Sequence, residues 1–218
     1  MTLQLEFDHL VVAADTLVRG VDHVERCLGA RCTAGGRHPK LGTHNALLGL
    51  GQDRYIEVIA IDPGAETPTT PRWFGLDDPG TQAALREQPR LLTWVARGRD
   101  LDAAVTACMH DPGRPRSMQR DDLHWRIAFP DDGALIEGGL VPSLIEWGHG
   151  VRHPARRLPD AGLRLHALHG VHPNPDPVRE RLAPLSLNDV LALEAGSAGE
   201  AVRLRAEIDT PGGLRWLD

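Results

Sequence analysis

The stretch FDHLVVAADTL, residues 7–17, contains the signals from which the fold follows. Its apolar, β-branched part, residues 7–14, predicts a buried strand. Asp15 and Thr16 then offer an N-cap, and apolar residues recur at helical spacing from Leu17 until Gly29 ends the series. We therefore predict a strand that leads directly into an amphipathic helix.

Further strands complete a unit around this pair. Residues 45–50 and 55–61 are apolar runs on either side of the turn Gly51-Gln52-Asp53, which predicts a hairpin. A weaker strand precedes the hairpin, and Gly35-Gly36 indicates a break. The first module, about residues 5–62, thus has the order strand, helix, weak strand, strand, strand.

The same order occurs a second time, at about residues 90–150. The stretch TWVARGRDL, residues 93–101, aligns with HLVVAADTL, residues 9–17, so that strand and helix start stay in register. Internal repetition is stronger evidence for architecture than a single motif. We therefore predict two tandem β-α-β-β-β modules.

A Pro-rich crossover, residues 63–89, joins the two modules. Its stretch PRWFGLDDP, residues 71–79, is too apolar at its centre for a solvated tether. We expect Trp73 and Phe74 to fold back and cover part of the molecule, as an ordered lid or edge.

A shorter β-α-β-β-β-like unit at about residues 160–218 completes the predicted α+β fold, which we treat as a single domain over residues 1–218. The predicted core is apolar: Leu10, Val12, Leu17, Val21, Val24, Leu28, Leu48, Ile56, Val58, Leu92, Val95, Val105, Ile127 and Leu168.

Composition limits the class of partner. The net charge of −6 and the scattered basic residues argue against nucleic acid, which needs clustered cations. The N-terminal stretch MTLQLEFDH lacks the pattern of a signal peptide, and no apolar run approaches the ~20 residues that span a bilayer. Cys27, Cys32 and Cys108 have neither redox nor zinc spacing, so we expect free thiols in a cytoplasmic protein.

Three blocks of the chain resemble the glyoxalase-like branch of the vicinal-oxygen-chelate superfamily, which also includes bleomycin-resistance proteins and extradiol dioxygenases. They are FDHLVVAA at residues 7–14, GGRHPKLGTHN at 35–45 followed by YIEVIAID at 55–62, and GLVPSLIEWG at 139–148. The resemblance covers nearly the whole chain. It implies that the paired modules curl into a β-sheet cup that encloses a small-molecule pocket.

The same resemblance implies a divalent metal, of which Fe, Mn, Ni, Co and Zn are candidates. In the superfamily, ligands come from the first and last strands of each module, which places His9 and Glu57 at those positions in the first half. An imidazole and a carboxylate suit these metals. A metal held in this way can chelate two oxygens of one substrate.

The second half departs from this pattern. Thr93 stands where His9 stands in the first half and is a poor ligand. Two residues compete as the counterpart of Glu57, and the sequence leaves both open. Glu137 lies as far beyond His124 as Glu57 lies beyond His44, whereas Glu146 lies in a matching local sequence and in the family signature; we favour Glu146 as metal ligand and catalytic residue.

The candidate substrate-binding residues are His38, His44, Asn45 and Trp73. Because side chains alternate along a strand, only one of His44 and Asn45 should face the cup. A site with two histidines and one carboxylate would need His38 or His44 as the second histidine. The series His166-x-x-His169-x-x-His172 is interpreted as a strand whose histidines face opposite sides, not as a metal cluster.

Two functional hypotheses remain. The first is a metal-dependent enzyme of the lyase, isomerase or dioxygenase type that acts on a small oxygenated substrate, with Glu146 or Glu57 moving a proton. The second is a non-catalytic binding or sequestering protein whose tryptophans hold a planar ligand without metal. In both cases the partner is a small molecule, neither nucleic acid nor membrane, with a homodimer as an open alternative.

Overall fold

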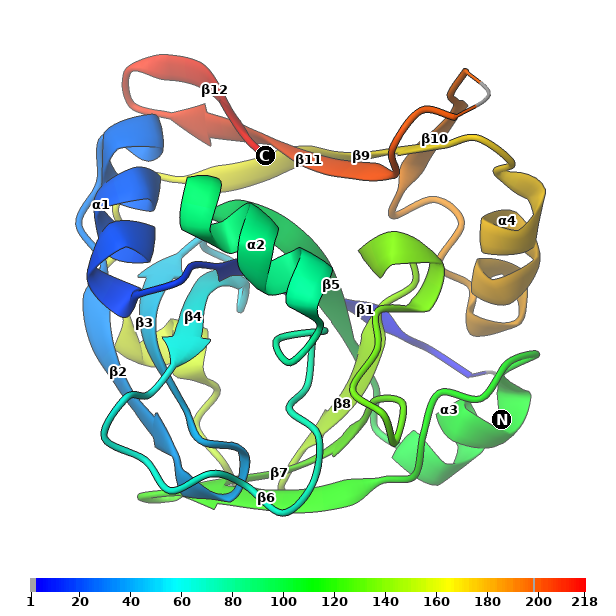
Figure 1. Ribbon diagram of the computed structural model, residues 1–218, viewed down its shortest axis with the longest axis horizontal. Helices are drawn as coiled ribbons and strands as arrows, with labels where there is room; N and C mark the ends of the chain where they lie inside the picture. The colour runs from blue at the N-terminus through cyan, green and yellow to red at the C-terminus, as the bar shows by residue number, and fades with distance from the viewer. Residues whose placement is uncertain (1–2, 198) are drawn as a thin grey trace.

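The computed structural model describes residues 3–197 and 199–218 and shows an α+β fold built on two sheets (Figure 1). The large sheet has eight strands in the order β2-β3-β4-β1-β5-β8-β7-β6. The small sheet has four strands in the order β10-β9-β11-β12. The tandem modules predicted from the sequence form the large sheet, and the shorter third unit forms the small one.

The first module follows the local signals of its sequence. The Thr16 side chain accepts a hydrogen bond from the Arg19 backbone N–H at the start of α1, and Gly29 ends that helix in the left-handed conformation, with a φ of 70°. The elements are β1 (Glu6–Ala13), α1 (Leu17–Leu28), β2 (Thr33–His38), β3 (Thr43–Gly49) and β4 (Tyr55–Ile61).

The second module repeats this order and this pairing. Its first and last strands, β5 and β8, pair in parallel, as β1 and β4 do, and antiparallel pairing of β1 with β5 joins the two modules. The elements are β5 (Arg90–Arg97), α3 (Leu101–Ala107), β6 (Arg116–Arg120), β7 (Leu123–Ala128) and β8 (Ser143–Trp147).

The large sheet curls until its two edge strands approach each other, at the bottom of Figure 1. The Lys40 ammonium, just after β2, donates a hydrogen bond to the Ser117 carbonyl oxygen of β6 over 3.2 Å. The predicted cup is therefore nearly a closed barrel.

The third unit has the predicted order of elements but a different pairing. Its first strand, β9, lies inside the small sheet, parallel to β10 and antiparallel to β11. In the first two modules the first strand pairs instead with the last one. The elements are β9 (Arg164–His172), α4 (Asp176–Leu182), β10 (Ala192–Ala195), β11 (Arg203–Thr210) and β12 (Gly213–Leu217).

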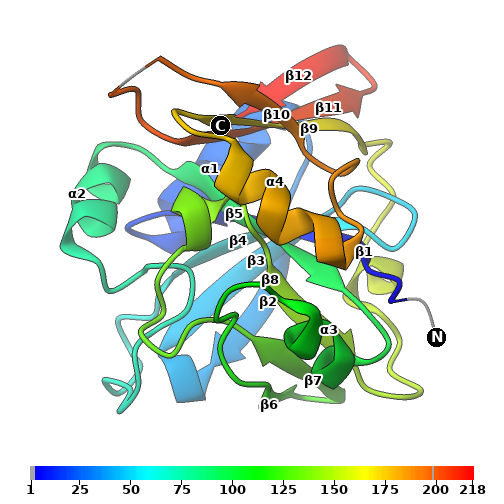
Figure 2. The same ribbon diagram turned by 90° about the vertical axis from the view of Figure 1, so that its right-hand side faces the viewer.

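Side-chain alternation gives the large sheet two apolar faces. On its outer face, Leu10, Val12 and Trp94 pack with Leu168 and Ile208 of the small sheet, which lies across this face in Figure 2. On its inner face, the cup has a second core that includes Val11, Ile59 and Trp125. Among the predicted core residues, Leu17, Val21, Leu92 and Val105 are half-buried and all the others are buried.

Two local expectations are corrected. Gly35-Gly36 is not a break: both glycines lie within β2, at a shift in its register with β3 between Ala34 and Arg37. The crossover contains a helix that the Pro-rich sequence did not indicate, α2 (Pro79–Glu87), whose first turn is capped by the Asp78 carboxylate. Trp73 and Phe74 do fold back, and each is only 2% exposed.

Cys27, Cys32 and Cys108 are free, half-buried thiols. Burial raises the pKa of the Cys32 thiol to about 12 and that of Cys108 to about 11, which makes both poor nucleophiles. Within the part of the chain that the structure describes, no helix is long and apolar enough to cross a membrane.

The contact of Gly139 with β5 yields a test of the fold. Gly139 has a φ of +96°, and a Cβ there would lie 1.9 Å from the Leu92 carbonyl oxygen. We expect Gly139→Ala to lower the free energy of unfolding by about 1–2 kcal/mol for the left-handed backbone and by a further ~1–3 kcal/mol for overpacking. Gly150→Ala is the matched control, because Gly150 has a φ of +77° but no atom within 4 Å of its Cβ position. Equal losses in urea denaturation would contradict the packing of Gly139 on β5.

Candidate functional site

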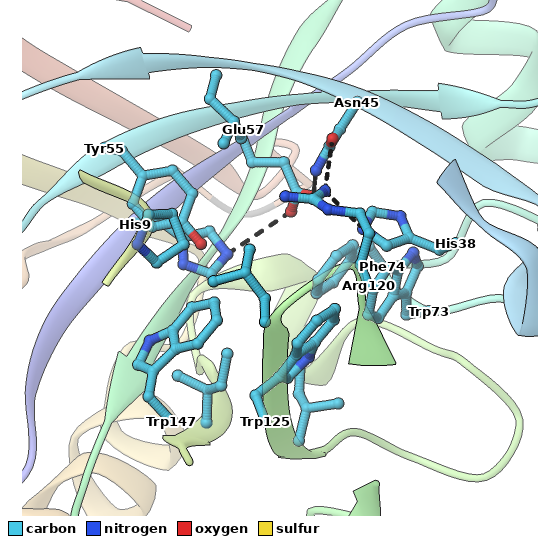
Figure 3. Close-up of a pocket in the computed structure, with 15 residues that line it drawn as sticks. His9, His38, Asn45, Tyr55, Glu57, Trp73, Phe74, Arg120, Trp125 and Trp147 are labelled. Carbon is cyan, nitrogen blue, oxygen red and sulfur yellow. Dashed lines mark hydrogen bonds and ion pairs between the residues drawn. The ribbon is translucent and has the colours of Figure 1, made fainter. Parts of the chain in front are cut away.

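The cup contains a narrow pocket between its two modules (Figure 3). The first module supplies a mostly polar wall from β1, β2, β3 and β4: His9, His38, Asn45, Leu47, Tyr55 and Glu57. The second module supplies an apolar wall with one cation: Arg120, Leu123, Trp125, Ile127, Ile145 and Trp147. Trp73 and Phe74 of the crossover and Pro154 complete the lining. The free volume is about 30 Å³, so these side chains leave room for little more than water.

His9 and Glu57 face each other in this pocket. The His9 Nε2 atom lies 3.6 Å from Glu57 Oε2, and the two residues are only 3% and 5% exposed. Glu57 Oε1 accepts a hydrogen bond of 2.6 Å from the Asn45 amide, and the His9 ring stacks on Tyr55 with centroids 4.4 Å apart. The sequence-predicted pair is thus brought together on adjacent strands.

A β-bulge orients His9. In the pairing of β1 with β5, Phe7 lies opposite Ala96 and His9 lies opposite Val95, so Asp8 is the extra residue. The Asp8 side chain is fully buried, and its Oδ1 accepts a hydrogen bond of 2.6 Å from His9 Nδ1. The Nε2 side of the ring is therefore left for Glu57.

Asp8 is held by donors from distant parts of the chain. Its Oδ2 atom accepts from Trp147 Nε1 at 3.1 Å, from His153 Nε2 at 3.0 Å and from the Arg97 guanidinium at 3.3 Å. A buried carboxylate is costly unless it is paired in this way. Asp8 thereby connects β1 to β5, to β8 and to the segment that follows β8.

These contacts make Asp8, His9 and Glu57 a charged chain. Burial on its own disfavours the charged form of each group, but for Asp8 the hydrogen bonds and charges of His153 and His9 outweigh it and lower the carboxyl pKa. For His9, the bonds and charges of Asp8 and Glu57 raise the pKa to about 9. The partnership with His9 likewise lowers the pKa of Glu57. At neutral pH, an imidazolium therefore lies between two carboxylates.

Arg120 crosses the pocket from β6 to the first module. Its guanidinium NH1 group donates to Asn45 Oδ1 over 3.0 Å and contacts His38 Nε2 at 3.4 Å. Arginine can only donate, so His38 Nε2 accepts and its Nδ1–H donates to Thr43 Oγ1 over 3.0 Å. Burial lowers the pKa of His38 to about 4, which agrees with a neutral ring. Arg120 forms no ion pair with a carboxylate among the described residues.

The glycines of β2 make room for this crossing. A Cβ on Gly36 would lie 2.5 Å from Arg120 Cδ, and a Cβ on Gly35 would lie 2.0 Å from Asn45 Oδ1. A side chain at Gly36 would displace Arg120, and a side chain at Gly35 would displace Asn45.

Glu146, the favoured catalytic residue and metal ligand, is not brought to this group. Ile145 and Trp147 face the pocket, so strand alternation turns Glu146 to the other side of β8. There its carboxylate accepts the Leu101 backbone N–H over 2.8 Å and lies 3.6 Å from Arg126. It caps α3.

Of the predicted substrate-binding residues, His38, Asn45 and Trp73 line the pocket, whereas His44 does not, and Glu137 and Thr93 also lie outside it. Glu137 pairs with Arg181 at 2.9 Å and with His172 at 3.3 Å, away from the pocket. His44 precedes Asn45 on β3 and does not line the pocket. Thr93 donates its hydroxyl to the Gly139 carbonyl oxygen over 2.9 Å, which is a structural bond between β5 and the segment before β8.

Paired β-α-β-β-β modules that curl into one sheet around a pocket are the architecture expected of the glyoxalase-like fold. A family model described as a glyoxalase-like domain matches residues 7–186. The chain belongs to this glyoxalase-like domain family. No curated protein matches it.

Solved structures similar to the chain come from several bacteria. A hypothetical protein from Staphylococcus aureus is 17% identical with a TM-score of 0.59, and the match covers 84% of this chain and 75% of that one. Methylmalonyl-CoA epimerase from Mycobacterium tuberculosis is 20% identical with a TM-score of 0.39, covering 64% of this chain and 86% of its own. A hypothetical protein from Bacillus halodurans is 12% identical with a TM-score of 0.44, covering 68% and 99% respectively.

Superfamily members often use a divalent metal, but the side chains of this pocket do not fit one. Catalytic metal sites generally use three protein ligands. Of the histidine and carboxylate side chains in the lining, His9 and Glu57 face each other, whereas both ring nitrogens of His38 are engaged by Arg120 and Thr43. The second module presents Ile145 from β8 and Val95 opposite His9, and neither is a donor. Among the residues that the structure describes, no group of three or more His, Cys, Asp or Glu side chains is arranged to hold a metal ion.

Neither Asp8 nor Arg120 was predicted from the sequence as a site residue. Asp8 had a usable signal, because a carboxylate within the apolar run of residues 7–14 must find partners if that strand is buried. The sequence around Arg120 carries no such signal, because it is one arginine in a weak edge strand and its partners lie far away in the first module.

The raised pKa of His9 predicts a pH-dependent stability. The folded value is about 9 against 6.5 in the absence of the fold, so the contribution is complete below pH 6.5 and is lost as the pH rises through 9. We expect the free energy of unfolding to fall by on the order of 2–3 kcal/mol across this window. Urea denaturation at several pH values should show this decline in the parent and a flatter profile in His9→Gln. Parallel profiles would mean that His9 is not protonated in the fold.

Proposed function

We propose that this protein is an enzyme that moves a proton on a small, oxygenated, anionic substrate bound in the cup. Glu57 and His9 are the acid–base pair, and Arg120 is the counter-ion. The observation that carries the proposal is the buried His9–Glu57 pair at the pocket surface, 3.6 Å apart and within one cavity with an arginine that lacks a carboxylate partner among the described residues.

The pair supports proton transfer because substrate binding changes the pKa of Glu57. When a substrate oxygen lies next to His9 Nε2, it replaces Glu57 as the acceptor of the Nε2–H group of the imidazolium. Glu57 then loses the partner that lowers its pKa, and its carboxylate becomes a stronger base towards a C–H bond beside that oxygen. Asp8 keeps the imidazolium oriented while negative charge develops on the oxygen. Isomerases and lyases both use this chemistry.

Arg120 supports an anionic substrate. A guanidinium has five N–H donors, and among the described residues only the NH1 group of Arg120 has partners, namely Asn45 and His38. The remaining donors suit a carboxylate, which arginine binds in a planar, bidentate manner. Because the free volume is about 30 Å³, Arg120 must move with the substrate from its place across the pocket.

The metal-dependent version of this function is disfavoured, because the second module supplies no metal ligand to the pocket. The alternative of a metal-free binding protein keeps one supporting observation. Trp73, Phe74, Trp125 and Trp147 surround the pocket, and such aromatic walls suit a planar ligand.

Hydrogen–deuterium exchange separates these possibilities. Loss of the C–H signals of 2-oxobutyrate, 3-oxobutyrate and methylmalonate is followed by proton NMR in D₂O, with EDTA present. We expect the parent to catalyse exchange of at least one of them and Glu57→Gln to be slower by about 100-fold or more, the usual contribution of a general base. Glu146→Gln is the control and should match the parent.

The remaining outcomes each decide between functions. Exchange only after EDTA is removed and Fe, Mn, Ni, Co or Zn is added would restore the metal-dependent enzyme. If none of the compounds exchanges and planar aromatic molecules bind stoichiometrically, the function is that of a binding protein and the enzyme proposal is wrong.

Gly36→Ala tests the position of Arg120 without removing its charge. The new methyl group would meet the Arg120 side chain and move the guanidinium away from Asn45. We expect the KM for an anionic substrate to rise by about 10- to 100-fold, as for a lost charged hydrogen bond, with kcat little changed. Arg120→Gln should match it. An unchanged KM in both variants would remove Arg120 from substrate recognition.

A further inference from the structure

A second, larger cavity lies outside the cup, between the start of β5 and the start of β11. Its volume is about 470 Å³, against about 30 Å³ for the pocket in the cup. A register shift in β5 between Leu91 and Thr93 lets both Leu91 and Leu92 line it. On the other side, β12 ends at Leu217 opposite Ala206, so the stretch 203–205 of β11 has no β12 residue beside it.

The cavity has a cationic rim over an apolar floor. Arg90, Arg203 and Arg205 supply the rim, and Leu91 and Leu204 belong to the floor. The only acidic side chain in the lining is that of Asp218, which lies 3.8 Å from Arg205. Glu200, outside the lining, pairs with Arg203. Positive charge is therefore in excess.

Two of these arginines retain unused donors. Arg205 stacks on the Trp216 ring, with the guanidinium carbon 4.5 Å from the ring centroid, and its Nε atom is buried without a hydrogen-bond partner among the described residues. Arg90 is exposed and forms no ion pair among those residues. A buried N–H without a partner is costly, and an acceptor in the cavity would remove that cost.

We propose that this cavity is a binding site for a small organic anion with an acidic head group and an apolar body. The head group lies at Arg90 and Arg205 and displaces the Asp218 carboxylate, and the body covers Leu91 and Leu204. This site shares no lining residue with the cup. The proposal of this site does not depend on the reaction proposed for the cup.

The test uses two fluorescent probes with the same body, 8-anilinonaphthalene-1-sulfonate and the uncharged 1-anilinonaphthalene. We expect saturable binding of the sulfonate, with a Kd raised at least tenfold in Arg205→Gln and in Arg90→Gln. The exposed Arg90 gives a variant with no packing to lose. Arg215→Gln is the matched control, because it removes the same charge from the same sheet outside the cavity. The uncharged probe should bind more weakly and respond to none of these changes.

NMR then locates the probe. The indole N–H of Trp216 should shift on addition of the sulfonate, while that of Trp147 in the cup should not, and Glu57→Gln should leave the Kd unchanged. Absence of saturable binding, an equal effect of Arg215→Gln, or a shift at Trp147 instead of Trp216 would each overturn the proposal.

Discussion

The buried carboxylate of Asp8 is the constraint on which the cup depends. A charge with no exposed surface is tolerated only if hydrogen bonds replace its water, and here four donors from four segments do so. Those segments are β1, β5, β8 and the loop after β8. Because the two carboxylate oxygens of Asp8 need donors from all of them, this one side chain fixes the relative position of both modules. The same carboxylate keeps His9 charged and oriented, which connects the stability of the sheet to the chemistry of the pocket.

The two modules have the same fold but contribute different kinds of side chain to the pocket. The first module places its polar side chains in the cup, where Glu57 forms an ion pair with His9 and accepts a hydrogen bond from Asn45. The second module uses the matching strands for packing: Val95 lies opposite His9, Ile145 faces the pocket, and Thr93 bonds to the backbone of Gly139. A duplicated architecture therefore gives one half of a polar site closed by an apolar wall, with Arg120 as the single cation that the second half contributes.

Local signals explain what could be predicted from the sequence. The start and end of α1 depend on Thr16 and Gly29, which act within a few residues, and the order of elements in all three units follows from such signals. Pairing in the third unit did not follow, because the packing of β9 against the large sheet decides it. Glu146 shows the limit of a sequence signature: it matched Glu57 in its neighbours, but the alternation of β8 directs it to α3. The place of Arg120 in the pocket could not be predicted from the sequence, because its contacts form only when the sheet curls.

The crossing of Arg120 over the mouth of the cup has a kinetic consequence. Strands β2 and β6 meet there, with Lys40 bonded to Ser117 beside the Arg120 contacts. A ligand that fills the cup must displace the Arg120 side chain from Asn45 and His38, because the free volume of the pocket is only about 30 Å³. Association therefore includes the rearrangement of this side chain, which makes it slower than a diffusion-controlled encounter.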